Sequence, residues 1–185
     1  MNTRISLDFA VVHALIILAL LIVPTPGVFG QVMYSATDLG VLPGGEVSYA
    51  FGINNNGQVV CYCTSTSGLV HAFLYSGGAI TDLGVLPGFS GSVGEGINNN
   101  GQVVGYCISG TTHHAFLYSG GSMTDLGVPP GFTDSYAYGI NNNGQVVGYC
   151  WNRSSGLIHA FLYSGGAITD LGVLANFWLC STIRG

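Results

Sequence analysis

Charged residues are scarce in this chain of 185 residues, and lysine is missing altogether. Only 6% of the residues are charged, and three arginines stand against eight acids, which gives a formal net charge of −5. A surface with so few cations cannot neutralise a series of phosphates. The composition therefore argues against nucleic acid and anionic membranes as partners.

Long apolar runs are also absent, except in the N-terminal stretch from Phe9 to Val23. Arg4 precedes this stretch, and prolines and small residues follow it before Gln31. The run is shorter than the ~20 residues of a typical membrane span and has the layout of a secretory signal peptide. We expect residues 1–30 to be a signal peptide and the protein to be secreted. The alternative is a chain anchored to a membrane through an uncleaved N-terminal segment.

The five cysteines are an odd number with no zinc-site spacing. Cys63, Cys107 and Cys150 occupy one position of a repeat described below, and Cys61 lies two residues before Cys63. We expect small buried thiols, with a bridge to Cys180 as the alternative. No metal or cofactor is expected.

Glycine and repetition are what the sequence has in abundance. There are thirty glycines, and three motifs recur in a fixed order. Thr-Asp-Leu-Gly begins at Thr37, Thr81, Thr124 and Thr169. Gly-Ile-Asn-Asn-Asn-Gly-Gln begins at Gly52, Gly96 and Gly139, and His-Ala-Phe-Leu-Tyr begins at His71, His114 and His159. A period of ~40–45 residues is typical of propeller blades with four strands each.

Each unit reads as two hairpins without helical periodicity. In the first unit, strands expected over 49–53 and 58–63 flank an Asn-Gly turn, and strands over 71–75 and 79–85 flank a Gly-Gly turn. The predicted fold is all-β, with tandem four-stranded repeats arranged like propeller blades.

Three units plus one strand fill the expected domain of residues 31–173. The units cover 37–80, 81–123 and 124–168, the final strand covers 169–173, and an irregular tail covers 174–185. Three alternatives follow from this count: an incomplete propeller, a homodimer that closes the ring, or a threefold β-trefoil or β-prism-like fold.

The unit GINNNGQVVGYC…HAFLYSGGAITDLG resembles the HAF-type extracellular repeat of bacterial proteins, and the similarity covers residues 37–173. The resemblance implies export, residence at the cell surface or in the matrix, and a propeller-like β fold. It implies no catalytic residues. Cys61 departs from the pattern, since Gly105 and Gly148 stand at that position in the other units.

Polar residues that repeat once per unit are predicted to be structural. We expect each histidine to hydrogen-bond a polar neighbour such as the Asp or Thr of the following strand, and each asparagine of the Asn-Gly turn to serve the turn alone. In a threefold fold, the histidines would instead meet on one axis. His113 breaks the pattern and is expected in an exposed loop. The repeated positions are His71, His114, His159, Asp82, Asp125, Asp170, Asn56, Asn100 and Asn143.

No catalytic motif occurs, so specificity is sought where the units differ. The residues in the variable loops most able to grip a ligand are Phe89, Phe132, Trp151 and Arg153. We expect a secreted, non-enzymatic repeat protein for extracellular recognition or a structural role, with a glycan or a cell-surface polymer as partner. The alternative is a carbohydrate-binding module or a fragment of a carbohydrate-active enzyme.

Overall fold

The computed structural model describes residues 34–68 and 70–173, and all regular structure in this part of the chain is β-strand. The strands belong to the unit that begins at Asp38. The expected signal peptide and the tail from residue 174 lie outside the described residues. Within those residues, no helix has the length and apolarity needed to cross a membrane.

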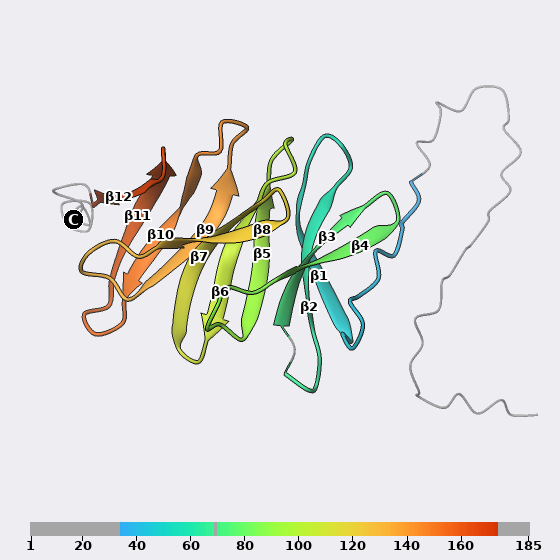
Figure 1. The fold of residues 1–185 in the computed structure, drawn as a ribbon, viewed down its shortest axis with the longest axis horizontal. Coiled ribbons are helices and arrows are strands. Elements are labelled where there is room, and N and C mark those ends of the chain that lie inside the picture. Colours follow the sequence, from blue (N-terminus) through green and yellow to red (C-terminus); the bar gives the residue numbers. More distant parts are fainter. Residues whose placement is uncertain (1–33, 69, 174–185) are drawn as a thin grey trace, which may run out of the picture. The chain divides into compact units, whose positions relative to one another are not determined.

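The strands form three four-stranded antiparallel sheets, each in sequence order (Figure 1). Sheet 1 contains β1 (Val47–Ile53), β2 (Val59–Thr64), β3 (Val70–Ser76) and β4 (Ala79–Gly84). Sheet 2 contains β5 (Gly91–Ile97), β6 (Val103–Ser109), β7 (Thr112–Ser119) and β8 (Ser122–Gly127). Sheet 3 contains β9 (Asp134–Ile140), β10 (Val146–Asn152), β11 (Leu157–Ser164) and β12 (Ala167–Gly172).

Sheet 2 lies between the other two, and the first strand of each later sheet packs on the sheet before it (Figure 1). This is the arrangement of successive propeller blades. The predicted all-β fold with tandem four-stranded repeats is confirmed, as an open stack and not a closed ring. The threefold alternative is not what the chain adopts, because the three sheets form a row.

The bounds of the sheets differ from the bounds expected for the repeat units, which begin with the Thr-Asp-Leu-Gly strand. Each Thr-Asp-Leu-Gly strand is the fourth strand of the sheet before it, so residues 169–172 complete sheet 3 as part of β12. The surplus copy is the first one, Thr37–Gly40, which forms no strand. The physical reason is the Gly-Gly turn, which pairs this strand with the His-Ala-Phe strand directly before it.

The Asn-Gly hairpins close as tight turns, and glycine is required at one position. The N–H of Gly57 donates to the carbonyl of Asn54 over 3.1 Å, and Gly57 has a φ of 72°. That left-handed conformation strains any residue with a Cβ. Residues Gly101 and Gly144 repeat the arrangement, with φ of 74° and 75°.

Two apolar layers of repeating composition hold the sheets together. Between sheets 1 and 2, Val60, Ala72 and Leu83 pack with Val103 and Phe116. Between sheets 2 and 3, the equivalent residues are Val104, Ala115, Leu126, Val146 and Phe161. Because each layer removes a phenylalanine and several aliphatic side chains from water, these layers supply most of the driving force for stacking.

The turns carry a ladder of asparagines that the sequence-based interpretation missed. The side-chain amide of Asn54 donates to the carbonyl of Asn98 over 2.9 Å, and the backbone N–H of Asn55 donates to Oδ1 of Asn99 over 3.0 Å. Asn56 donates from Nδ2 to the carbonyl of Asn99 over 2.9 Å. The same three bonds join the second turn to the third. The asparagines therefore link sheets as well as forming turns.

Candidate functional site

The repeated histidines and aspartates pair within each sheet, as expected from the sequence. His71 Nδ1 lies 3.0 Å from Oδ2 of Asp82, and the two later pairs have distances of 2.8 Å and 2.9 Å. These are His114–Asp125 and His159–Asp170. Each aspartate also accepts the N–H of the glycine two residues on. The three histidines are thus held in separate sheets and do not converge.

Two of the four expected ligand-binding residues cover these histidines. The ring of Phe89 lies 5.1 Å from the ring of His114, and Phe132 lies 5.1 Å from His159. Both phenylalanines are half-buried in the connections between sheets. The structure therefore places Phe89 and Phe132 in two different connections, each against its own histidine. The connection that holds Phe132 is bonded to the end of β10, since the N–H of Thr133 donates to the carbonyl of Trp151 over 2.9 Å.

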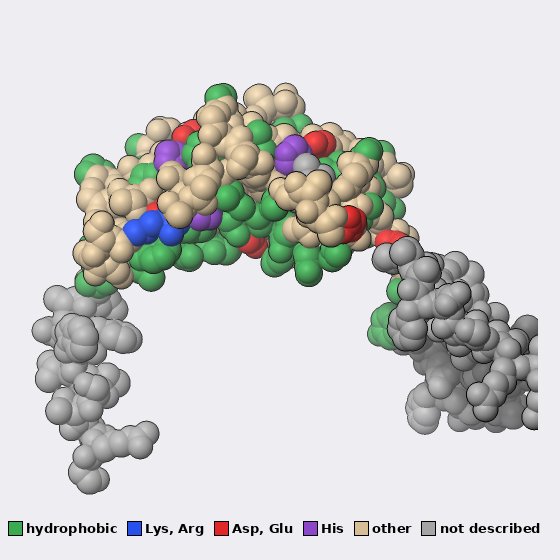
Figure 2. All heavy atoms as spheres, turned by 90° about the horizontal axis from the view of Figure 1, so that it is seen from below, with side chains coloured by type: hydrophobic (Ala, Val, Ile, Leu, Met, Phe, Trp, Pro, Cys, Tyr) green, Lys and Arg blue, Asp and Glu red, His purple; other side chains and the backbone are tan. Residues whose placement is uncertain are grey.

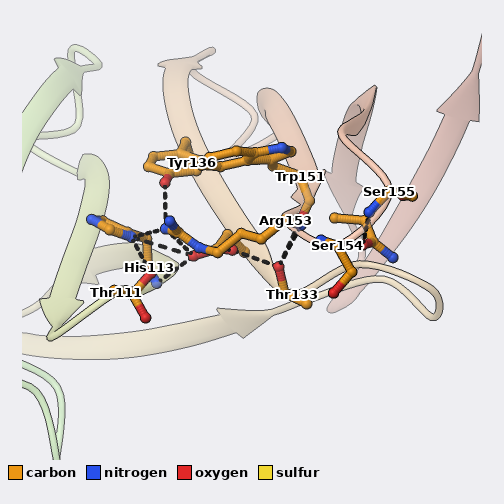
Figure 3. A network of polar contacts seen from close by, with 10 residues as sticks. Thr111, His113, Thr133, Tyr136, Trp151, Arg153, Ser154 and Ser155 are labelled. Atoms are coloured by element: carbon orange, nitrogen blue, oxygen red, sulfur yellow. Dashed lines mark hydrogen bonds and ion pairs between the residues drawn. The ribbon is translucent and has the colours of Figure 1, made fainter.

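Arg153 belongs to a buried ionic network, shown in Figure 3. It donates from Nε to Oδ2 of Asp134 over 2.7 Å and from Nη2 to Oδ1 over 2.8 Å. Thr133 donates its hydroxyl to the same carboxylate over 2.6 Å, and His113 donates its backbone N–H over 2.9 Å. Burial raises the pKa of Asp134, but these hydrogen bonds together outweigh it, so the pKa lies below its usual value.

The guanidinium is therefore paired with a buried carboxylate, while the Arg153 side chain remains 31% exposed. Its carbon Cζ also lies 4.5 Å from the centroid of the Trp151 ring, a cation–π contact. In Figure 3 the Trp151 and Tyr136 side chains lie on one side of the Arg153 side chain.

His113 is a member of this network, which corrects its expected place in an exposed loop. It lies on β7, and its side chain is 19% exposed. Arg153 donates from Nη2 to His113 Nδ1 over 2.8 Å. The same Nδ1 lies 3.1 Å from the carbonyl oxygen of Thr111 and 3.3 Å from Oδ1 of Asp134, so the network surrounds this side of the imidazole.

A second group of residues is positioned by β-bulges in the first strand of every sheet. The pairing shifts between Ala50 and Gly52 in β1 and between Gly94 and Gly96 in β5, and the third sheet has the same irregularity. The extra residue is Phe51, Glu95 or Tyr138. A bulge turns one side chain away from the regular pleat, and bulges often lie next to binding sites.

These three residues lie in a band of aromatic rings along the first two strands of each sheet. We call it the tyrosine band; it consists of Tyr49, Phe51, Tyr62, Glu95, Tyr106, Tyr136, Tyr138 and Tyr149. The Tyr62 ring is stacked with Tyr49 and Phe51 at 5.1 Å and 5.5 Å. The Tyr149 ring lies 4.8 Å from Tyr136 and 5.7 Å from Tyr138. Figure 2 shows hydrophobic side chains gathered along the lower side of the stacked sheets.

Glu95 lies among these phenols and interacts with rings from all three sheets. Burial raises the pKa of Glu95. Burial, together with the charge of Glu95, raises the pKa of Tyr106 to about 12, and the same charge contributes to the raised pKa of Tyr62 and Tyr138. The band thus combines a partly desolvated carboxylate with ring faces and phenolic hydroxyls. Phe51 is 51% exposed and Tyr138 43%.

The side chains of the band suit hydrogen bonding and ring contacts, not metal binding. Glu95 is its one acid, and in residues 34–68 and 70–173 no three histidines, cysteines or acids are grouped so that they could hold a metal ion. Sequence reasoning did not single out these positions, although a signal exists: Phe51, Glu95 and Tyr138 differ, while the residue that follows each of them is always glycine. A variable residue before an invariant glycine in a strand marks a bulge.

No protein-family model matches the chain, and no curated protein matches it either. Among solved structures, it is similar to the β-propeller domain of the Trilobed protease from Pyrococcus furiosus, which is described as having an open velcro topology. The TM-score is 0.47 at 15% sequence identity, over 67% of this chain and 38% of that one.

Proposed function

We propose that this protein is a non-enzymatic recognition protein that binds a neutral glycan on the tyrosine band. The observation that carries the proposal is the placement of Phe51, Glu95 and Tyr138, three unlike side chains, at equivalent bulges within a row of stacked rings. A scaffold of identical repeats thereby presents an asymmetric surface, as recognition of a defined ligand requires.

The chemistry of the band favours sugars without charge. Aromatic faces pack against the apolar faces of pyranose rings, while phenols and a carboxylate can hydrogen-bond hydroxyl groups. An acidic polymer would meet Glu95 and a net charge of −5. Among the residues that the structure describes, the single guanidinium is that of Arg153, which is paired with Asp134.

The enzymatic alternative requires more than the band contains. Glycosidases use two carboxyl groups about 5–9.5 Å apart in unlike surroundings. Asp134, the acid in the neighbouring network, is fully buried and paired with Arg153. Binding without turnover is therefore the function that these residues support.

An extracellular location is part of the proposal. It is supported by the apolar N-terminal stretch from Phe9 to Val23 and by the resemblance to HAF-type repeats. A glycan of a matrix or a cell surface is the corresponding ligand class.

Affinity electrophoresis through gels containing neutral β-glucan, mannan or xylan, followed by calorimetry with matching oligosaccharides, tests the proposal. We expect retardation by at least one neutral polymer. Phe51→Ala and Tyr138→Ala should each weaken binding about tenfold, since an aromatic contact contributes ~0.5–1.5 kcal/mol beyond the area it buries.

Tyr34→Ala is the matched control, because Tyr34 is 91% exposed and is not one of the residues that form the band. This variant should bind as the unaltered protein does. Equal binding by all three variants would contradict the site, and retention only by acidic polymers such as alginate would contradict the ligand class.

A further inference from the structure

The two outer faces of the stack carry the same residues that are buried between its sheets. On sheet 3, Val147 is 49% exposed and Leu171 56%. The equivalent pairs, Val60 with Leu83 and Val104 with Leu126, are 6% exposed or less because the next sheet covers them. We call the surface formed by Val147, Ala160 and Leu171 the trailing face.

Sheet 1 exposes the complementary surface. Ile53 is 70% exposed, whereas its equivalents Ile97 and Ile140 pack against the preceding sheet. We call the surface formed by Ser48, Ala50 and Ile53 the leading face. Leu42 already lies beside this face in contact with Phe73. Leu86 occupies the same place in the contact between sheets 1 and 2.

The asparagine ladder has a direction, and its two ends differ. In both internal contacts, a backbone N–H of one turn donates to the Oδ1 of the next, first Asn55 to Asn99 and then Asn99 to Asn142. At the ends, the N–H of Asn142 and the Oδ1 of Asn55 have no such partner within residues 34–68 and 70–173. A donor end on sheet 3 therefore matches an acceptor end on sheet 1.

A buried serine at each contact between sheets has the same direction, because it always comes from the later sheet and bonds the backbone of the earlier one. Ser92 accepts the N–H of Ala72 over 2.9 Å and donates to the carbonyl of Gly84 over 2.6 Å. Ser135 makes the same two bonds to Ala115 and Gly127. The next pair in this series would be Ser48, on the leading face, with Ala160 and Gly172, on the trailing side.

The space over one glycine in the first strand of each sheet also indicates that a further sheet fits on sheet 3. A Cβ at Gly52 would lie 3.2 Å from the carbonyl oxygen of Glu95, and one at Gly96 would lie 2.6 Å from that of Tyr138. A Cβ at Gly139 would meet only the side chain of Val147, at 3.1 Å. The space over Gly139 therefore fits a further bulge, and the next bulge residue in the series is Phe51.

From these four correspondences we propose that the trailing face of one chain docks on the leading face of a second copy of the same chain. The contact is head-to-tail, so the two surfaces are different, and two copies can satisfy both faces if the rotation closes. Such a pair has six sheets, within the four to eight of known propellers. The proposal concerns assembly and does not depend on the glycan site.

The test is the solution mass of the purified protein, by light scattering and by sedimentation over a range of concentrations. We expect a dimer. Val147→Asp disables only the trailing face and Ile53→Asp only the leading face, and both positions are exposed, so the fold should persist. Each variant alone should be monomeric, and an equimolar mixture should form a one-to-one complex through the remaining intact contact.

Gly139→Ala should weaken the dimer at least tenfold, because its Cβ enters the space expected for a backbone carbonyl. Leu157→Asp is the control, since Leu157 is 42% exposed and faces away from the trailing face. A monomeric native protein would overturn the proposal, as would variants that remain monomeric on mixing. Circular dichroism confirms that each variant is folded.

Discussion

The carboxylate of Asp134, with none of its side chain exposed, is held at both oxygens by the guanidinium of Arg153, over 2.7 Å and 2.8 Å. The pair joins the start of β9 to the turn after β10. Replacing Arg153 by alanine leaves a buried carboxylate without its countercharge, which lowers the free energy of unfolding. We expect this loss of unfolding free energy in urea denaturation of Arg153→Ala. Arg153→Lys, which keeps the charge but loses the two-point geometry, should lose less; equal stability of Arg153→Ala and the native protein would contradict the assignment.

Acid should destabilise the protein through the same carboxylate. The pKa of Asp134 is lower in the folded than in the unfolded chain, so the folded state binds the proton less tightly. Its stabilising contribution is present above the ordinary aspartate value of about 3.9 and is lost as the pH falls through the folded pKa. Denaturation at several pH values should show a flat region near neutrality and a decline below about pH 4. Asp134→Asn should make that decline shallower; an unchanged acid profile would contradict the role.

Glu95, unlike Asp134, should lower the stability of the folded protein when it is ionised. Burial raises the pKa of Glu95, so its ionised form opposes folding at neutral pH. We therefore expect Glu95→Gln, which keeps the shape of the side chain, to raise the melting temperature at pH 7. The difference should shrink once the pH falls below the folded pKa and vanish below the unfolded pKa, where Glu95 is protonated in both states. A residue that lowers the stability of its own fold is typical of functional sites. A lower melting temperature for the variant would show that Glu95 is a stabilising residue instead.

The thiols of the four described cysteines should be inert in the folded protein. Cys61, Cys63, Cys107 and Cys150 are free and buried, and burial raises the pKa of Cys61 and Cys107 to about 11. Because the thiolate is the reactive form, a thiol reagent at mildly alkaline pH should label none of them in a Cys180→Ser variant. All four should react in concentrated guanidinium. Rapid labelling of one thiol in the native protein would contradict its burial.

The hairpins were predictable because their determinants are local. An Asn-Gly or Gly-Gly pair between short apolar strands is sufficient to predict a reversal, and the strands of sheet 1 lie within two residues of their expected bounds. The starting point of each sheet was not predictable in the same way. A periodic sequence is compatible with any starting point, and Thr37–Gly40 reads like Thr169–Gly172 although only the latter is a strand.

The candidate site depends on β-bulges and on residues found in one unit only, which are difficult to recognise when the repeats are aligned with one another. The bulges at Phe51, Glu95 and Tyr138 are shifts of backbone pairing, which leave only an invariant glycine as a trace. The network of Asp134 and Arg153 depends on two residues that occur in one unit alone. Gly91 and Val47 occupy the position of Asp134 in the other sheets, so the departure from the repeat was the available signal.

The stacking of the sheets in a row determines the order in which the sheets of one chain unfold. Sheet 2 has a neighbour on both sides, whereas sheets 1 and 3 have one each. In an array whose units touch only their neighbours, stability is the sum of unit terms and contact terms, so the middle unit is the last to lose its structure. In the monomeric Val147→Asp variant, unfolding then proceeds from the ends inward, and the amide protons of β6 and β7 will exchange with solvent more slowly than those of β2, β3, β10 and β11.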